Sequence, residues 1–321
     1  MVPMAHVTDL GLTALVGRRW PLQHRVMAMN EENLRATTDY SGNRHDESVR
    51  TATPTWIAER DRDRLIMFTH VPKTGGTTLK QILTINYGRF FADHHPRIQN
   101  LNDEIESGTR DPLDLLAISS HLPYGVHRTI PGIEDRILLP MTVVREPKKR
   151  IISYYNFVTT FRAHRLHAAT KDLDINEFFA RGLEDGWGEI SNSQCRLVHG
   201  GSLRTFEAAR KTLENDYFAY SALEDIGELI TRVGELLGWP PAGGEERRAN
   251  QSPKKQGWDD LEPDIAAELE LRNAGDIELH ELLAGCGPVI REEMLTETAD
   301  ERNARQHRST STTADDEFQA G

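Results

Sequence analysis

Apolar and polar positions alternate with two different periods along the middle of the chain. Four short apolar runs have the length and composition of buried strands, at residues 65–71, 114–121, 137–144 and 217–222. Five segments repeat apolar residues at i, i+3 and i+4, as amphipathic helices do, at 78–87, 147–162, 203–215, 224–237 and 264–284. Strands that alternate with helices are typical of α/β proteins. We therefore predict a single domain over residues 61–291, with a P-loop-like parallel β-sheet flanked by helices.

The two ends of the chain lack this periodicity. Residues 1–60 mix Arg, His, Asn and Thr with scattered apolar residues. Residues 292–321 are rich in Thr, Asp and Glu and contain too little apolar surface to form a core. We expect flexible extensions at both ends: a partly disordered N-terminal extension at 1–60 and a disordered tail at 292–321.

Charge and composition disfavour several classes of partner. The 321 residues include 38 Lys and Arg against 50 Asp and Glu, a net charge of −12, which argues against a nucleic acid or an anionic membrane as the main partner. Cys195 and Cys286 are the two cysteines, and they lie far apart without metal-binding spacing. No apolar run approaches the roughly 18 residues of a membrane span, and no basic segment precedes the apolar N-terminal stretch. We expect a cytoplasmic protein in which an anion site must be built locally.

The first group of candidate ligand-binding residues lies in the sequence "HVPKTGGTTL", which joins the predicted strand at 65–71 to the predicted helix at 78–87. Ligands bind at such junctions in open α/β sheets, because the first N–H groups of the helix lack partners and carry partial positive charge. Paired glycines let the backbone approach an anion closely, and the lysine and threonines add a charge and hydroxyl donors. The predicted phosphate-binding loop comprises Lys73, Thr74, Gly75, Gly76, Thr77 and Thr78.

This loop is not a Walker A motif. That motif places Lys after the glycines, whereas Lys73 precedes Gly75 and Gly76, and Thr77 stands where the Lys would fall. A kinase that uses ATP or GTP is therefore disfavoured. For the loop taken alone, the alternative is an ordinary tight turn with a solvated lysine.

A second candidate anion site lies in the sequence "VVREPKKRIISYYNF". Arg145 follows a predicted strand, and Pro147 suits the first turn of a helix. Ser153 lies six residues beyond Pro147, roughly 9 Å along a helix axis, so the guanidinium and the hydroxyl could hold the same anion. For this segment alone, the alternative is an Arg paired with a carboxylate beside a solvated helix surface.

The two segments together resemble sulfotransferases that use 3′-phosphoadenosine 5′-phosphosulfate (PAPS), in particular the branch that includes heparan sulfate 2-O-sulfotransferases and bacterial relatives. The resemblance implies that the loop around Lys73 holds the 5′-phosphosulfate, and that Arg145 and Ser153 hold the 3′-phosphate. The sequence "AISSHLPYG" is similar to the segment that carries the catalytic His of the family, here His121. The sequence "SNSQCRLVHG" resembles a helix that reads Asn-x-Gln-x-Arg in the family, here Asn192, Gln194 and Arg196.

The resemblance also implies chemical roles. Lys73 would stabilise charge on the leaving phosphate oxygen together with N–H groups of the loop, and His121 would take the proton of the acceptor. His94 and His95 are an alternative source of the base. No metal is implied, and the sequence contains no metal-ligand cluster. The sequence "RRANQSPKK" stands where the family has a loop that closes over the nucleotide. The nucleotide contacts expected from this loop are Arg247 and Asn250.

We therefore expect an enzyme that transfers a sulfuryl group from PAPS, with PAP as product, to a hydroxyl or amine of a carbohydrate or small molecule. The segments expected to line the acceptor pocket are 87–111 and 161–187. Two alternatives stay open. One is a P-loop-type kinase, which would require ATP and Mg²⁺; the other is a non-catalytic nucleotide-binding protein.

Overall fold

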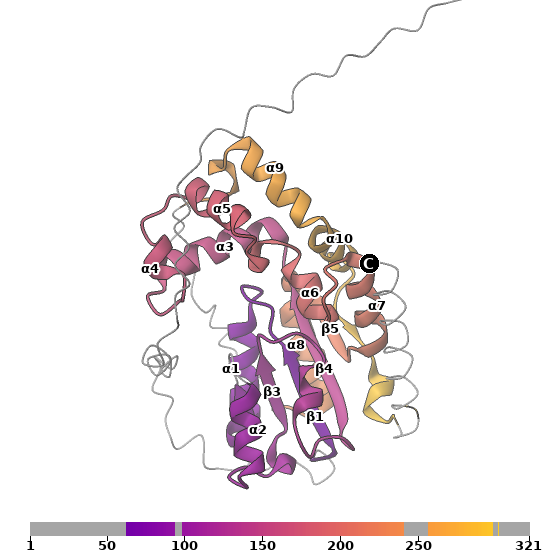
Figure 1. Cartoon of the computed structure of the whole chain (residues 1–321). Coiled ribbons are helices and arrows are strands. Elements are labelled where there is room, and N and C mark those ends of the chain that lie inside the picture. Colours follow the sequence, from indigo (N-terminus) through magenta and orange to yellow (C-terminus); the bar gives the residue numbers. More distant parts are fainter. Residues whose placement is uncertain (1–61, 94–97, 241–255, 298–300, 302–321) are drawn as a thin grey trace, which may run out of the picture. The chain divides into compact units, whose positions relative to one another are not determined.

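The computed structural model describes residues 62–93, 98–240, 256–297 and 301, all within one compact unit (Figure 1). The strands in this part of the chain are β1 Arg64–Thr69, β2 Phe91–Asp93, β3 Ala117–Ser120, β4 Ile137–Val144, β5 Ala219–Ala222 and β6 Val289–Ile290. The α-helices are α1 Gly76–Tyr87, α2 Ile98–Glu106, α3 Pro147–Thr160, α4 His167–Thr170, α5 Ile175–Glu184, α6 Ser193–His199, α7 Phe206–Asp216, α8 Ile226–Leu237, α9 Pro263–Arg272 and α10 Ala274–Leu283. Short 3-10 helices are η4 Gly88–Phe90, η5 Pro112–Asp114, η6 Val126–Thr129, η7 Gly188–Ile190, η8 Leu223–Asp225, η9 Trp258–Asp260 and η10 Glu292–Leu295.

The sheet places β1 at the point where the strand order reverses. Among the described residues the order is β2-β3-β1-β4-β5-β6, and every pairing is parallel except that of β5 with β6. The chain therefore moves from β1 to β3 on one side and to β4 on the other. The carboxyl ends of strands at such a switch point form a crevice in open α/β sheets. The predicted α/β fold with a mostly parallel sheet is confirmed.

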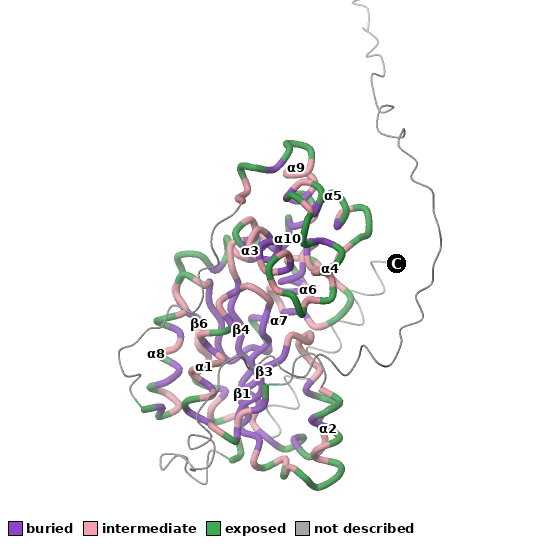
Figure 2. Tube along the Cα trace, turned by 90° about the vertical axis from the view of Figure 1, so that its left-hand side faces the viewer, coloured by how far each residue is buried: buried purple, intermediate pink, exposed green. Residues whose placement is uncertain are grey.

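Helices cover both faces of the sheet because successive strand residues point to opposite sides. Phe68 of β1 packs in one core cluster with Leu79 of α1 and Leu229 of α8. Met67, the preceding residue, packs in another cluster with Leu101 of α2. A third cluster joins the end of the sheet to α6, α7 and α10. Figure 2 shows the result: β1, β3, β4 and β5 are mostly buried, whereas α2 and α8 each turn one side to solvent.

A separate helical cluster follows the carboxyl end of the sheet. The apolar sides of α3, α5 and α9 pack together there, around the fully buried Phe178 and Phe179. In Figure 1 these helices lie beyond the strands, next to the loops that leave β1 and β4. The sheet and this cluster together position the loops described below.

The structure differs from the predicted elements in several places. Helices α2, α4 and α5 were not predicted. The predicted helix at 264–284 is two helices, α9 and α10, which meet at Asn273. Asn273 is buried and has a non-helical backbone, and its side-chain amide donates to the carbonyls of Ile190 and Leu269 at 2.8 Å. The short strands β2 and β6 were not predicted. Residues Glu292–Leu295, at the start of the predicted tail, form η10, and Met294 is 1% exposed within the core.

Candidate functional site

Three predicted site residues lie at one edge of the sheet, because each follows the end of one of three adjacent strands. Lys73 lies four residues after the end of β1, His121 follows β3 directly, and Arg145 follows β4 directly. The register pairs Thr69, the last residue of β1, with Ser120 of β3 and with Thr142 of β4. The loops that carry Lys73, His121 and Arg145 therefore leave the sheet side by side at the switch point.

The loop after β1 has a backbone that its glycines make possible. Gly75 has a φ of 80° and Lys73 a φ of 72°, in the left-handed region. Gly76 begins α1, and a Cβ at this position would lie 1.8 Å from Nε2 of His70, so no larger residue fits without a rearrangement. The N–H of Thr78 donates to the carbonyl of Gly75 at 3.0 Å. The N–H groups of Gly76 and the exposed Thr77 open the helix, where donors have no carbonyl partner within the helix.

The threonine hydroxyls of this loop differ in burial and in their hydrogen bonds. Thr74 is fully buried, and its hydroxyl donates to the carbonyl of Val71 at 2.9 Å. We expected this hydroxyl to face an anion, but it closes the loop instead. Thr77 is exposed and Thr78 is partly buried. The hydroxyls that could reach an anion are thus those of Thr77 and Thr78.

Lys73 and Arg145 are in direct contact. Nη1 of Arg145 donates to the carbonyl oxygen of Lys73 at 2.9 Å. The ammonium of Lys73 lies over the ring of Phe157 on α3, 4.3 Å from the ring centroid, a favourable cation–π geometry. Burial, and then the positive charge of Arg145, lower the pKa of Lys73 from 10.5 to about 8. The predicted pair of cations therefore belongs to a single site.

Ser153 lies on the side of α3 that faces this pair. It precedes Phe157 by four residues, and residues at i and i+4 share one face of a helix. The side chain of Ser153 is partly exposed. The side chain of Glu146 caps α3 by accepting from the N–H groups of Lys148 and Lys149 at 2.9 and 2.8 Å. The start of α3 is thus already occupied by a carboxylate, and Ser153 and Arg145 remain as the donors on this side.

Burial also acts on the guanidinium of Arg145. It lowers the pKa of Arg145 from 12.5, while the nearby carboxylates of Glu146 and Glu224 raise it. Arginine keeps its charge through shifts of this kind. The site therefore presents a permanent cation from β4 and a titratable one from the loop after β1.

The geometry of His121 fixes which nitrogen carries a proton. Nδ1 lies 2.7 Å from the backbone carbonyl of His70. A carbonyl oxygen only accepts, so Nδ1 carries the hydrogen and the lone pair of the neutral ring is on Nε2. The ring of His70 lies against that of His121, with 4.0 Å between ring centroids. This arrangement suits His121 to accept a proton at Nε2.

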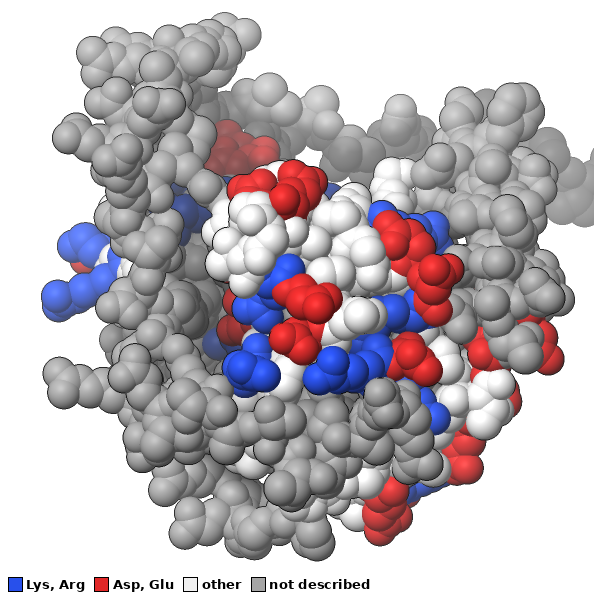
Figure 3. Space-filling model, turned by 90° about the horizontal axis from the view of Figure 1, so that it is seen from below, with Lys and Arg blue, Asp and Glu red and all other residues white. Residues whose placement is uncertain are grey.

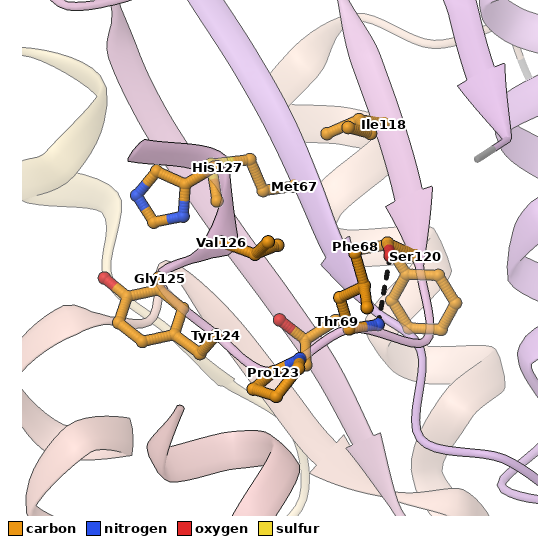
Figure 4. A pocket seen from close by; sticks show the side chains of 11 residues that line it. Met67, Phe68, Thr69, Ile118, Ser120, Pro123, Tyr124, Gly125, Val126 and His127 are labelled. Atoms are coloured by element: carbon orange, nitrogen blue, oxygen red, sulfur yellow. Dashed lines mark hydrogen bonds between the residues drawn. The ribbon is translucent and has the colours of Figure 1, made fainter. Parts of the chain in front are cut away.

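A pocket lies under the loop that follows His121 (Figure 4). Its walls come from two strands and from the loop that follows β3. The strand residues are Met67, Phe68, Thr69, Ile118 and Ser120, and the loop residues run from Leu122 to His127 and include Tyr124. The N–H of Leu122 donates to Oγ of Ser120 at 3.0 Å and holds the loop against β3. Burial, and then the charge of Arg128, lower the pKa of His127 to about 3. The His127 side chain is neutral at pH 7, so it offers this pocket no positive charge for an anion.

On one face of the part that the structure describes, the charged side chains are of mixed sign. At the lower end of the view in Figure 1, away from α3, Figure 3 shows basic and acidic side chains interspersed among the described residues. Mixed charge of this kind produces no strong field of one sign.

Four residues named from the sequence lie outside the described residues: His94, His95, Arg247 and Asn250. Within the described ranges, no group of three or more His, Cys, Asp or Glu could hold a metal ion. None of the helices described is both long and apolar enough to cross a membrane.

Sequence reasoning missed one residue and one contact at the site. Phe157, which was not named, lies under the ammonium of Lys73. Gln194 was named, but its two hydrogen bonds to the backbone of Arg145 were not expected. Phe157 could have been found from its spacing of four residues from Ser153. The side chain of Gln194 comes from α6, and no local pattern connects it to β4.

Comparison with known families agrees with this geometry. A model of the sulfotransferase family matches residues 56–177. The match supports sulfotransferase activity. It spans the strands β1, β3 and β4, and it includes Lys73, His121, Arg145 and Ser153. No curated protein sequence matches the chain significantly.

Proposed function

We propose that the protein is a PAPS-dependent sulfotransferase related to the branch that includes heparan sulfate 2-O-sulfotransferases. It would transfer a sulfuryl group to a hydroxyl or amine of a carbohydrate or small molecule in the cytoplasm. The family match supports the reaction class. The donor and the acceptor class are inferred from the residues of the site.

One observation carries the proposal. The guanidinium of Arg145 touches the backbone of Lys73, and the ammonium of Lys73 lies over Phe157, one helical turn from Ser153. Two predicted anion-binding segments that are far apart in the sequence therefore lie against each other. A nucleotide with anionic groups on both its 5′ and 3′ sides needs two such groups of donors. Lys73 with the N–H groups of Gly76 and Thr77 would hold the 5′ side, and Arg145 with Ser153 the 3′ side.

The reaction requires a proton acceptor, a proton donor and a water-poor site. PAPS, when bound, supplies an activated sulfuryl group: the acceptor oxygen forms a bond to sulfur as the bond from sulfur to the phosphate oxygen breaks. His121 takes the acceptor proton at Nε2, since Nδ1 is committed to the carbonyl of His70. The ammonium of Lys73 donates a hydrogen bond to the leaving phosphate oxygen as negative charge grows there. The residues in these roles need no metal.

The acceptor would bind next to His121, between the segments at 87–111 and 161–187. The loop that contains Arg247 and Asn250 would contribute contacts to the nucleotide. With a net charge of −12, the chain does not favour a nucleic acid as substrate. A carbohydrate hydroxyl carries the proton that His121 would accept at Nε2.

A ligand panel separates this function from its alternatives. We expect PAP to raise the melting temperature of the full chain, and ATP with Mg²⁺ or GTP to raise it less, because ligands that bind the native state stabilise it. Incubation of cell extract with PAPS and the protein should then reveal compounds that gain the mass of one SO₃ group. Stabilisation by ATP with Mg²⁺ but not by PAP would favour a kinase. Strong binding of PAP without any sulfated product would favour a non-catalytic binding protein.

A further inference from the structure

We propose that Gln194 is the positioning residue that orients Arg145 for the 3′-phosphate of the donor. This inference rests on the proposed function and concerns a residue that touches neither the donor nor the acceptor. Gln194 is a buried residue of α6, whereas the candidate site residues follow the ends of β1, β3 and β4.

The contact between Gln194 and Arg145 uses both ends of one carboxamide. Oε1 of Gln194 accepts from the backbone N–H of Arg145 at 2.9 Å, and Nε2 donates to the backbone carbonyl of Arg145 at 2.8 Å. Gln194 is completely buried. Paired bonds of opposite direction fix both the position and the plane of the backbone that they hold, as a neighbouring strand would.

Arg145 needs such support because it lies just beyond the sheet. The last pair between β4 and β5 joins Val144 to Ala222, and Arg145 follows Val144 with no further partner in that ladder. Gln194 thus continues the pairing by one residue. From a backbone held in this way, the guanidinium reaches across to the carbonyl of Lys73 at 2.9 Å.

Gln194 is itself held in place by α10. The carboxylate of Asp276 accepts from the N–H of Gln194 at 3.1 Å and from the N–H of Cys195 at 2.8 Å. The N–H of Asp276 in turn donates to Oδ1 of Asn192 at 3.0 Å. Asp276 and Gln194 are both fully buried. A continuous set of hydrogen bonds therefore leads from α10 through α6 to Arg145 and on to the loop of Lys73.

A positioning role and a purely structural role make different predictions. If Gln194 acts through Arg145, its loss should lower the affinity for nucleotides that carry a 3′-phosphate and leave the affinity for a nucleotide with a 5′-phosphate alone unchanged. If Gln194 only packs α6 against the sheet, its loss should lower the affinity for all nucleotides alike, or lower only the stability of the protein. Adenosine 3′,5′-bisphosphate (PAP) and adenosine 5′-phosphate differ by the 3′-phosphate and can distinguish the two roles.

The test measures the affinity of the full chain for these two nucleotides by calorimetry, with the melting temperature as a check on folding. Gln194→Met keeps the volume and removes both hydrogen bonds. We expect Gln194→Met to lower the affinity for PAP about tenfold, the equivalent of one to two net hydrogen bonds. The affinity of this variant for adenosine 5′-phosphate should stay within about twofold of the wild-type value. Gln99→Met, on the exposed side of α2, is the matched control and should change neither.

A double-mutant cycle completes the test. In an Arg145→Met background, Gln194→Met should lower the affinity for PAP little further, because both substitutions remove the contact of Arg145 with the 3′-phosphate. Equal losses for the two nucleotides, or additive losses in the cycle, would overturn the role of Gln194 and leave the proposed function intact. A wild-type protein that binds PAP no more tightly than adenosine 5′-phosphate would overturn both.

Discussion

We predict that the ammonium of Lys73 sets an upper pH limit for activity. With a pKa of about 8, Lys73 in the free protein is about 90% protonated at pH 7 and about 10% protonated at pH 9. The role proposed for this side chain requires the protonated form. Since kcat/KM reports the ionisation of the free enzyme, kcat/KM for PAPS should fall about tenfold from pH 7 to pH 9, with a midpoint near pH 8.

Stability should move in the opposite direction over the same range. The pKa of Lys73 is lower in the folded protein than the ordinary value of 10.5, so the unfolded chain binds more protons between pH 8 and 10.5. The contribution of Lys73 to the free energy of unfolding therefore rises with pH across that window and falls again as the pH drops toward 8. A loss of activity between pH 7 and 9 would thus not come from unfolding caused by Lys73.

The assay follows initial rates at low PAPS concentration from pH 6.5 to 9.5, with the melting temperature measured at each pH. Lys73→Arg should have lower activity but lose the alkaline decline, because a guanidinium stays protonated throughout this range. Lys149→Arg, an exposed substitution on α3, is the control and should keep the wild-type profile. An unchanged alkaline decline in Lys73→Arg would refute the assignment of this ionisation to Lys73.

Three further substitutions probe the base, the loop and the buried charges. His121→Gln should lower kcat by about 10²–10⁴-fold and leave PAP affinity unchanged by calorimetry; near-normal turnover would place the base elsewhere. Gly76→Ala brings a Cβ to 1.8 Å from Nε2 of His70, so thermal unfolding should show a loss of about 1–3 kcal/mol, and wild-type stability would contradict the described packing. Arg150→Met leaves the buried carboxylate of Asp276 without its compensating charge, and denaturant unfolding at pH 7 should show a loss of about 3–5 kcal/mol; a neutral effect would indicate that Asp276 does not depend on this charge.

The strands and most helices follow from local patterns, and the places where prediction fails have physical causes. Residues 137–144 form β4 as predicted, because an uninterrupted apolar run of this length suits a strand buried on both faces. Asn273 divides the helix predicted at 264–284 because its buried amide binds the carbonyls of Ile190 and Leu269. The partner carbonyl of Ile190 is distant in sequence, so no helical period could have indicated the break.

The sequence names candidate site residues but not their contacts. Lys73 and Arg145 stand out because they are cations that follow strand ends, and Ser153 because of its place on the helix after Arg145. The inward turn of the Thr74 hydroxyl depends on the carbonyl of Val71, which faces it only in the folded loop. The contact between Gln194 and Arg145 joins α6 to β4 across the fold, and a tertiary contact of this kind leaves no trace in local spacing.

The left-handed backbone at Lys73 has a practical use. Glycine adopts a φ near 72° without the steric cost that other residues pay, roughly 1–2 kcal/mol, although it loses more backbone entropy on folding. Replacement of Lys73 by glycine should therefore delete the ammonium with little cost to the fold. Such a catalytically silent chain, immobilised with PAP, could retain its unmodified acceptor from a metabolite mixture and so reveal the substrate directly.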